Sequence, residues 1–214
     1  SRILAQQNAD ERIEPASITK IMTGYVVSDQ VHQGFIDLND EVFVSENCWR
    51  KGGSRMFIEE GSAVILLDLI KGMVIQSGND ASCAIAEHVA GSEENFVDLM
   101  MRYAEKMGLS NTNFVNPTGW PDENHYSSAR DIAQISAALI RDFPDHYSIY
   151  KEKWFRVGKI LDLKNISKFN KYVTDNELSE FSIDILARLQ EVIHSDRIIN
   201  YFLEKEQDLD KALN

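Results

Sequence analysis

The sequence predicts an α+β fold in which helices make up most of the chain. Apolar residues recur at helical spacing over residues 15–34 and again over 66–75. Residues 41–61 look different, because they are broken by Gly52-Gly53-Ser54, expected to be a flexible tip, and by Gly61. Short strands and loops are typical of such a stretch. The N-terminal residues 1–4 also have the pattern of a strand, so the sequence combines several helices with a few short strands.

Each further helix has its own start or stop signal. Asp80 is expected to cap a small helix that runs to residue 91. Ser92 is expected to cap a longer helix, which ends at Gly108. Ser127 is expected to cap a last helix that ends at Pro144. The interior of the domain is therefore predicted to be built mainly from these helices.

The length of 214 residues suits one domain, or one domain with an appendage. The character of the chain changes after Phe155. Residues 159–214 contain neither proline nor glycine and are rich in Lys, Asp, Glu and Asn, with helical periodicity. We therefore place a boundary near Val157-Gly158, which separates a domain of residues 1–156 from an acidic, mostly helical tail of residues 157–214.

Composition excludes several classes of function. With 43% hydrophobic and 26% charged residues, the chain resembles an average globular protein. A formal charge of -12 argues against binding to nucleic acid, which needs clustered cations. No apolar run approaches the ~20 residues of a membrane span, so no membrane tether is visible in the sequence.

Neither the histidines nor the cysteines predict a metal site. The five histidines lack the H-E-x-x-H spacing and have no cysteine partners. Cys83 lies in a helix of small residues and is expected to be a buried, inert thiol. The sequence therefore predicts no metal and no cofactor.

Ser17 and Lys20 form an S-x-x-K motif at the start of an amphipathic segment. In a helix, positions i and i+3 share one face, so the amine can reach the hydroxyl. The first turn also offers free backbone N–H groups that favour a developing oxyanion. To act as a base Lys20 must be neutral, and burial among apolar neighbours would lower its pKa. Taken alone, the motif is better explained by Ser17 as a helix N-cap and Lys20 as a solvated side chain. A second match at Ser148–Lys151 has no site-like surroundings.

Ser77-Gly78-Asn79 places a hydroxyl and a carboxamide on a tight glycine turn. Such turns are common. Combined with the S-x-x-K motif, however, this turn completes the parts that an acyl-transfer enzyme with a serine nucleophile requires. No G-x-S-x-G sequence is present, which disfavours an α/β-hydrolase.

Three stretches resemble the D-alanyl-D-alanine carboxypeptidases among the low-molecular-mass penicillin-binding proteins: PASITKIMTGYVV, GGSRMFIEEGS and the long run from QSGNDASCAIAEHVAG to YSIYKEK. The resemblance covers about residues 1–155. It implies a β-lactamase/transpeptidase-like fold, with helices on a five-stranded antiparallel sheet and the active site between sheet and helical lobe. By matching position it implies that Ser17 is the acylated nucleophile, Lys20 its general base and Ser77 a proton relay, while Asn79 holds the peptide.

The third motif of that family, Lys-Thr-Gly, has no match in the sequence. In the family, the strand that carries it binds the substrate carboxylate and supplies one of the two oxyanion N–H groups. The chain also starts at the family's second strand. We therefore expect the helical lobe to be present and the antiparallel sheet to be incomplete.

The resemblance implies a serine-type D-Ala-D-Ala carboxypeptidase that acts on peptidoglycan pentapeptides through an acyl-enzyme on Ser17, impaired by the loss of Lys-Thr-Gly. It also implies β-lactams as covalent ligands, and a location in the bacterial periplasm or on the outer face of the cytoplasmic membrane. One alternative is a catalytically dead relative, or a fragment, that binds peptidoglycan or a partner. A serine β-lactamase is disfavoured because Gly78 stands where class A enzymes have Asp.

Overall fold

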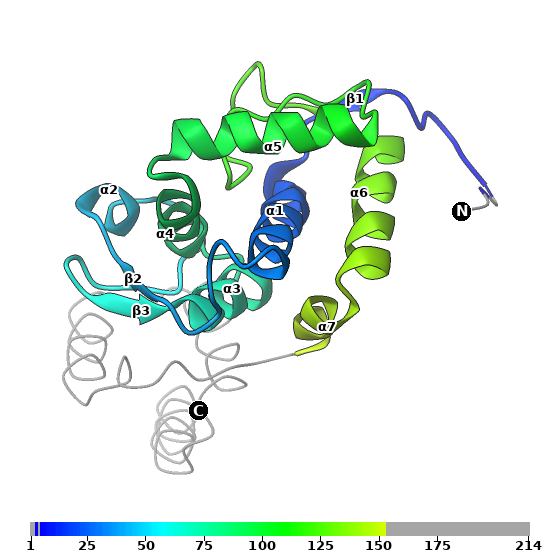
Figure 1. Cartoon of the computed structure of the whole chain (residues 1–214). Coiled ribbons are helices and arrows are strands. Elements are labelled where there is room, and N and C mark those ends of the chain that lie inside the picture. The colour runs from blue at the N-terminus through cyan, green and yellow to red at the C-terminus, as the bar shows by residue number, and fades with distance from the viewer. Residues whose placement is uncertain (1–2, 4, 153–214) are drawn as a thin grey trace, which may run out of the picture. The chain divides into compact units, whose positions relative to one another are not determined.

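The computed structural model describes residue 3 and residues 5–152, and this part of the chain is mostly helical (Figure 1). The predicted tail of residues 157–214 and, apart from residue 3, the predicted strand at residues 1–4 lie outside the described residues. The α-helices are α1 (Lys20–His32), α2 (Glu46–Trp49), α3 (Leu66–Ile75), α4 (Asn79–Ala90), α5 (Glu93–Met107), α6 (Ala129–Asp142) and α7 (Pro144–Tyr147). Two 3-10 helices accompany them, η1 (Ala16–Thr19) and η2 (Ser148–Lys151).

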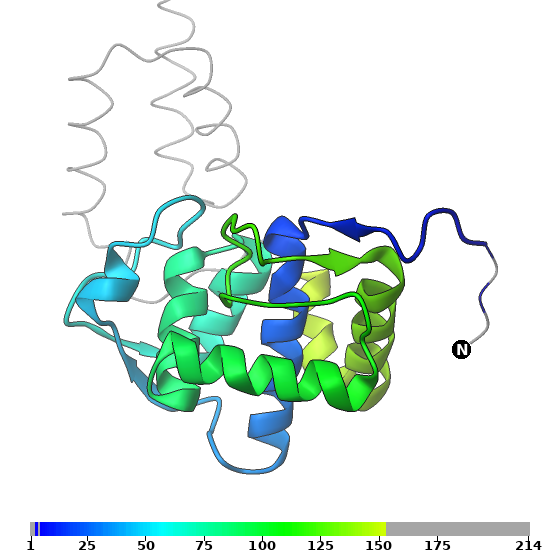
Figure 2. The same cartoon turned by 90° about the horizontal axis from the view of Figure 1, so that it is seen from above.

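The helix α1 lies at the centre of this unit, between α4 and α6, and α5 crosses beside it (Figures 1 and 2). It also contacts α3. Such a position needs a helix that is buried on most of its surface, and seven of the thirteen residues of α1 are buried. Because Gly24 has no side chain, the Tyr150 hydroxyl can approach α1 closely; a Cβ at position 24 would overlap this hydroxyl. The largest fully buried side chains come from every helix around α1 and include Met22, Leu66, Leu69, Met73, Ile85, Phe96, Met100, Ile135 and Leu139.

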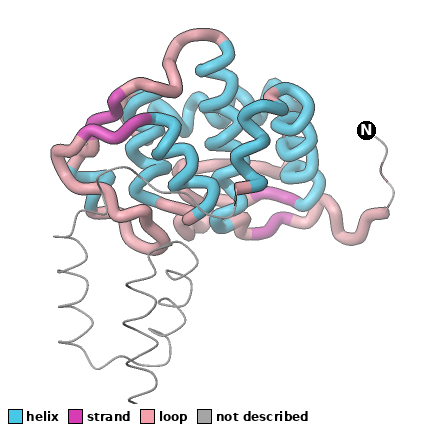
Figure 3. Tube along the Cα trace, turned by 90° about the horizontal axis from the view of Figure 1, so that it is seen from below, coloured by secondary structure: helices cyan, strands magenta, loops and turns pink. Residues whose placement is uncertain are grey.

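The strands are short and form two separate antiparallel pairs (Figure 3). β1 (Arg12–Ile13) pairs with β4 (Ser127–Ser128), with Arg12 opposite Ser128. β2 (Glu41–Phe43) pairs with β3 (Ala63–Ile65), with Val42 opposite Val64. Residues 5–152 therefore contain the helical lobe without a five-stranded sheet, which confirms the predicted α+β class and the incomplete sheet.

Most helix ends follow the sequence signals. The Ser92 hydroxyl accepts a hydrogen bond from the Asn95 N–H at the start of α5, and Gly108 ends that helix in the left-handed conformation. The cap of α6 was predicted one residue too early, because Ser127 pairs in β4 and the Ser128 hydroxyl makes the capping bond. At the first helix, the opening turn is the 3-10 helix η1, and the α-helix begins only at Lys20.

The prediction that Asp80 caps α4 was wrong. The helix begins at Asn79, and its N-cap residue is Gly78, two residues before the predicted cap and without any side-chain cap. Asp80 therefore lies inside the first turn. Its carboxylate instead accepts hydrogen bonds from backbone N–H groups of the segment before β3, as described below.

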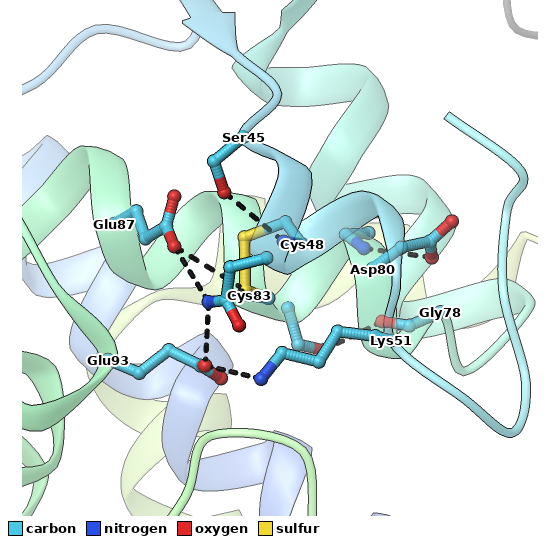
Figure 4. Close-up of a disulfide and its surroundings, with 11 residues drawn as sticks. Ser45, Cys48, Lys51, Gly78, Asp80, Cys83, Glu87 and Glu93 are labelled. Carbon is cyan, nitrogen blue, oxygen red and sulfur yellow. Dashed lines mark hydrogen bonds and ion pairs between the residues drawn. A yellow bond between two sulfur atoms is a disulfide. The ribbon is translucent and has the colours of Figure 1, made fainter. Parts of the chain in front are cut away.

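The prediction that Cys83 is an inert thiol was also wrong, because Cys48 and Cys83 form a disulfide between α2 and α4 (Figure 4). Their Cα atoms are 5.2 Å apart. Next to the disulfide, the Lys51 amine forms a 2.5 Å ion pair with Glu93 of α5. Single-sequence reasoning missed the bond because the two cysteines lie 35 residues apart and nothing in their spacing marks a pair.

None of the helices in the described part of the chain has both the length and the apolar character that crossing a bilayer requires.

Removal of the disulfide should lower the free energy of unfolding by about 3–4 kcal/mol, because a cross-link across a loop of this length restricts the unfolded chain. Urea unfolding with and without dithiothreitol measures the difference. The double variant Cys48→Ala/Cys83→Ala is the control and should show the lower stability in both conditions. Equal stability of the reduced and oxidised wild type would contradict this account.

Candidate active site

Ser17 and Lys20 lie together at the junction of η1 and α1. The Lys20 amine is 3.3 Å from the Ser17 hydroxyl oxygen, so the predicted i to i+3 contact is confirmed. Their environments differ sharply, because Ser17 is exposed while Lys20 is only 6% exposed. The residue before the serine, Ala16, has a φ of +46°, a conformation that alanine rarely adopts. Ser17 is thus exposed to solvent, and the amine of the buried Lys20 lies next to its hydroxyl.

Two carbonyl oxygens hold the Lys20 amine from opposite parts of the chain. It donates a 2.7 Å hydrogen bond to Oδ1 of Asn79, at the start of α4. It donates a second bond, of 2.8 Å, to the backbone oxygen of Thr118, in the long loop between α5 and β4. Neither oxygen can donate a proton in return. Both acceptors therefore fix the direction of the Lys20 N–H bonds.

Burial lowers the pKa of Lys20 from 10.5 to about 8, because the apolar surroundings disfavour the ammonium form. The negative charge of Asp80 acts in the opposite direction and raises it. A substantial fraction of Lys20 is consequently neutral near pH 8. The sequence analysis expected this direction of shift.

The loop that carries Thr118 is closed by the side chain of Asn116. Its Oδ1 accepts hydrogen bonds from the backbone N–H groups of Thr118, Gly119 and Trp120, and from the Thr118 hydroxyl. Turns of this kind are a characteristic use of asparagine. The Thr23 hydroxyl of α1 donates a 2.7 Å bond to the oxygen of Pro117. The loop is thus shaped by its own asparagine and attached to the helix that bears Lys20 (Figure 2).

His125 makes a second attachment between this loop and η1. Its Nδ1 accepts a bond of 3.1 Å from the Val115 N–H, so in the neutral ring the proton is on Nε2. Nε2 lies 2.8 Å from the hydroxyl of Thr19 and donates to it. Burial lowers the pKa of His125, which keeps this neutral form. The sequence analysis missed both His125 and Asn116. Asparagine at the start of the Asn116-Pro117-Thr118-Gly119 turn is nevertheless a signal that the sequence contains.

Asn79 joins the site to the segment before β3. Its Nδ2 donates a 2.8 Å bond to the Gly52 oxygen, and its backbone N–H donates a 2.7 Å bond to the Ser54 oxygen. The first bond fixes which end of the carboxamide faces Lys20. The predicted flexible tip at Gly52-Gly53-Ser54 therefore packs onto the start of α4. The half-exposed ring of Trp120 covers Gly52, where a Cβ would come within 3.2 Å of the ring.

Ser77 directly precedes these groups and has an unusual backbone. Its φ is +57°, a strained value for serine, and such strain is concentrated at functional sites. Its hydroxyl is buried and makes no hydrogen bond within the described part of the chain. Its predicted role as a proton relay stays a prediction.

The structure separates the two S-x-x-K matches. Ser148 and Lys151 occupy η2, and both side chains are exposed. Lys151 lacks the burial that lowers the pKa of Lys20. Burial, which the motif cannot encode, is what distinguishes Ser17–Lys20.

Substitution of Gly119 should damage the site far more than substitution of a glycine with similar dihedrals elsewhere. Gly119 has a φ of +81°, and a Cβ there would overlap the Ala16 oxygen. Gly91, with φ +83°, has no atom within 4 Å of that position. Gly91→Ala should cost about 1–2 kcal/mol because of its left-handed backbone alone. Gly119→Ala should cost clearly more, and urea unfolding measures both losses. Equal losses would mean that the loop is not pressed against η1.

Comparisons with known proteins identify the family of this chain. A family model described as D-alanyl-D-alanine carboxypeptidase matches residues 1–180, which extends beyond the residue 155 where the sequence resemblance was thought to end. D-alanyl-D-alanine carboxypeptidase DacC of Escherichia coli is 47% identical over 165 residues, which are 74% of this chain and 41% of that protein. The chain therefore spans about two fifths of the length of this curated relative.

Solved structures give the same result. Penicillin-binding protein 5 of Haemophilus influenzae matches with a TM-score of 0.72 and 46% identity, over 74% of this chain and 47% of that one. The D-alanyl-D-alanine carboxypeptidase DacD of Francisella tularensis matches with a TM-score of 0.69 and 38% identity, over 71% of this chain and 37% of that one. The helical lobe is thus that of a β-lactamase/transpeptidase fold, and the chain belongs to the D-alanyl-D-alanine carboxypeptidase family.

Proposed function

We propose that Ser17 is the nucleophile of a serine-type D-Ala-D-Ala carboxypeptidase, with Lys20 as its general base. The observation that carries the proposal is the setting of the Lys20 amine, buried, partly neutral near pH 8 and 3.3 Å from an exposed hydroxyl. A base must be able to lose its proton near the working pH and must lie within reach of the group that it deprotonates. Lys20 meets both conditions.

The hydrogen bonds of Lys20 also direct its lone pair. A neutral amine has two N–H groups, and the carbonyl oxygens of Asn79 and Thr118 accept one each. The lone pair is then left for the Ser17 hydroxyl, which donates to it. In the ammonium form the third N–H would point at Ser17 instead, and the serine could not be deprotonated. The arrangement therefore favours one direction of proton transfer.

The proposed reaction uses these groups in two stages. Lys20 takes the hydroxyl proton as Ser17 attacks the carbonyl carbon of the penultimate D-alanine. Collapse of the tetrahedral intermediate breaks the peptide bond, and the leaving amine receives a proton, which we assign to relay through Ser77. Water then hydrolyses the acyl-enzyme and regenerates Ser17. Asn79 is assigned to hold the peptide, since its Nδ2 has a second N–H besides the one that Gly52 accepts.

The family supplies the proposed substrate and location. Its relatives are D-alanyl-D-alanine carboxypeptidases and penicillin-binding proteins, so we propose a peptidoglycan pentapeptide ending in D-Ala-D-Ala as substrate and β-lactams as covalent ligands. Such a substrate lies outside the cytoplasm, which favours the periplasm or the outer face of the cytoplasmic membrane. Residues 1–156 would form the catalytic domain, and 157–214 a separate tail.

We also propose that turnover by these 214 residues is impaired. The sequence has no Lys-Thr-Gly, the motif that the family resemblance assigns to the substrate carboxylate and to one oxyanion donor. Loss of one oxyanion donor in other enzymes costs about 10²–10³ in rate. The nucleophile and the base lie on the helical lobe and do not depend on that motif. Acylation and hydrolysis of the acyl-enzyme both pass through an oxyanion, so loss of the donor should slow both steps.

Fluorescent penicillin should label Ser17 and no other residue, with mass spectrometry of the adduct as the measurement. The exposed Ser148 is the internal control, because its motif partner Lys151 is solvated. Ser17→Ala should remove the label. An adduct at Ser148 would contradict the assignment, and the absence of any adduct would favour a relative that only binds.

In the same assay, Lys20→Arg should abolish labelling while the protein stays folded, because arginine keeps its proton at any working pH. The wild-type rate should rise with pH through about 8, as Lys20 becomes neutral. Undiminished labelling of the arginine variant would show that Lys20 is not the base.

Release of D-alanine from a pentapeptide should be at least about 10²-fold slower than for a family member that contains Lys-Thr-Gly. The penicillin adduct on Ser17 serves as the active-site count, so that both rates refer to the same number of competent molecules. Comparable release per labelled site would refute the proposed impairment. Rapid loss of the adduct would instead indicate a β-lactamase.

A further inference from the structure

The segment of residues 45–58, which contains α2, is attached to α4 and α5 along its whole length. At one end the disulfide of Cys48 with Cys83 joins it to α4, and the Lys51–Glu93 ion pair joins it to α5 (Figure 4). In the middle, Gly52 and Ser54 accept hydrogen bonds from Asn79, as described above. The remaining attachment is at residues 56–58.

At that end, three consecutive N–H groups converge on one carboxylate. Oδ1 of Asp80 accepts from Met56 at 3.0 Å, and Oδ2 accepts from Phe57 at 2.9 Å and from Ile58 at 3.3 Å. Asp80 is 1% exposed, so these bonds compensate the burial of its charge. Successive N–H groups around an anion form a nest that stabilises negative charge.

The backbone of this nest is strained. Phe57 has a φ of +62° although its side chain is large and 65% exposed, so packing of the ring does not impose the conformation. A strained residue keeps such a φ only when its surroundings compensate the cost. The Asp80 carboxylate is the group placed to do so, because it binds the N–H of Phe57 and of both its neighbours.

We propose that Asp80 is a positioning residue for the reaction at Ser17, acting through the 45–58 segment. The carboxylate holds residues 56–58, and the same segment presents the Gly52 oxygen to Asn79. That bond turns the Asn79 carboxamide so that Oδ1 faces Lys20. Asp80 therefore sets the direction of the Lys20 N–H bond to Asn79 without contacting Lys20. This inference rests on the proposed function of Ser17 and Lys20.

Asp80 also has an electrostatic effect on the same lysine. Of the titratable groups around Lys20, α4 contributes Asp80, whose charge raises the pKa of Lys20. The loop before β4 contributes His125, which is bonded to Thr19 and kept neutral by burial. Neutralising Asp80 should therefore lower the pKa of Lys20. A purely structural role would not produce this effect.

Asp80→Asn removes the charge and turns an NH₂ group toward N–H donors that need an acceptor. Asp131→Asn is the matched control, because Asp131 is also 1% exposed and lies in the first turn of a helix. Its carboxylate likewise binds a loop, through the Asn111 N–H at 2.8 Å and the Thr112 hydroxyl at 2.7 Å. Both variants thus replace a buried carboxylate with a carboxamide, but each releases a different segment of the chain.

Three measurements on the full chain test the proposal. In Asp80→Asn, amide hydrogen exchange should accelerate in residues 52–58, and penicillin acylation should slow by about 10²-fold, the effect of misplacing reacting groups. The acidic limb of its pH–rate profile should move to lower pH. Asp131→Asn should leave exchange in 52–58 and the position of the acidic limb at their wild-type values. Equal acylation rates in Asp80→Asn and the wild type, or an unmoved limb, would overturn the proposal.

If Asp80→Asn does not fold, Asp80→Glu provides the test, because it keeps the charge but moves the carboxylate by one methylene. Its acylation should slow while the acidic limb stays in place, and a wild-type rate would overturn the proposal. Failure of the proposed function gives a different result, in which the wild type itself is not acylated. In that case the pKa of Lys20, measured by NMR of ¹³C-labelled lysine, must still fall in Asp80→Asn, and an unchanged value would refute the role of Asp80.

Discussion

The burial of the Lys20 amine is the constraint on which the rest of the site depends. An amine that is 6% exposed needs acceptors close by, because an unpaired polar group in the interior is costly. Its acceptors come from two distant segments, the start of α4 and the loop between α5 and β4. Each segment must therefore be held accurately. The Asn116 turn, the His125 bonds and the bonds of Asn79 to Gly52 and Ser54 all serve that requirement.

The same requirement explains where backbone strain occurs. Outside glycine, the described residues with positive φ are Ala16 beside the nucleophile, Ser77 before Asn79, Phe57 in the nest of Asp80 and the surface residue Asn8. Three of these four positions lie in or next to the site. Strain persists where surrounding contacts determine the conformation, and the central packing of α1 together with the Cys48–Cys83 disulfide provides such surroundings.

The described residues form the helical lobe of a fold whose active site, in the family, lies between lobe and sheet. In the function that we propose, nucleophile and base belong to the lobe, whereas recognition of the substrate carboxylate belongs to the sheet. The lobe is organised by contacts of its own, since among the described residues the hydrogen-bond partners of Lys20 are Ser17, Asn79 and Thr118. Activation of the nucleophile and recognition of the substrate carboxylate are thus separable in physical terms, because they rest on different layers of the structure.

The sequence by itself determined the order and limits of most helices, the Ser17–Lys20 contact and the membership in the family. These depend on local spacing and capping, which neighbouring residues encode. It did not determine the disulfide, the interior position of Asp80 or the roles of Asn116 and His125. Those depend on contacts between segments up to 106 residues apart, as between Thr19 and His125. Only the packing of α4 and the long loop against α1 brings those groups together, and the burial that results lowers the pKa of Lys20.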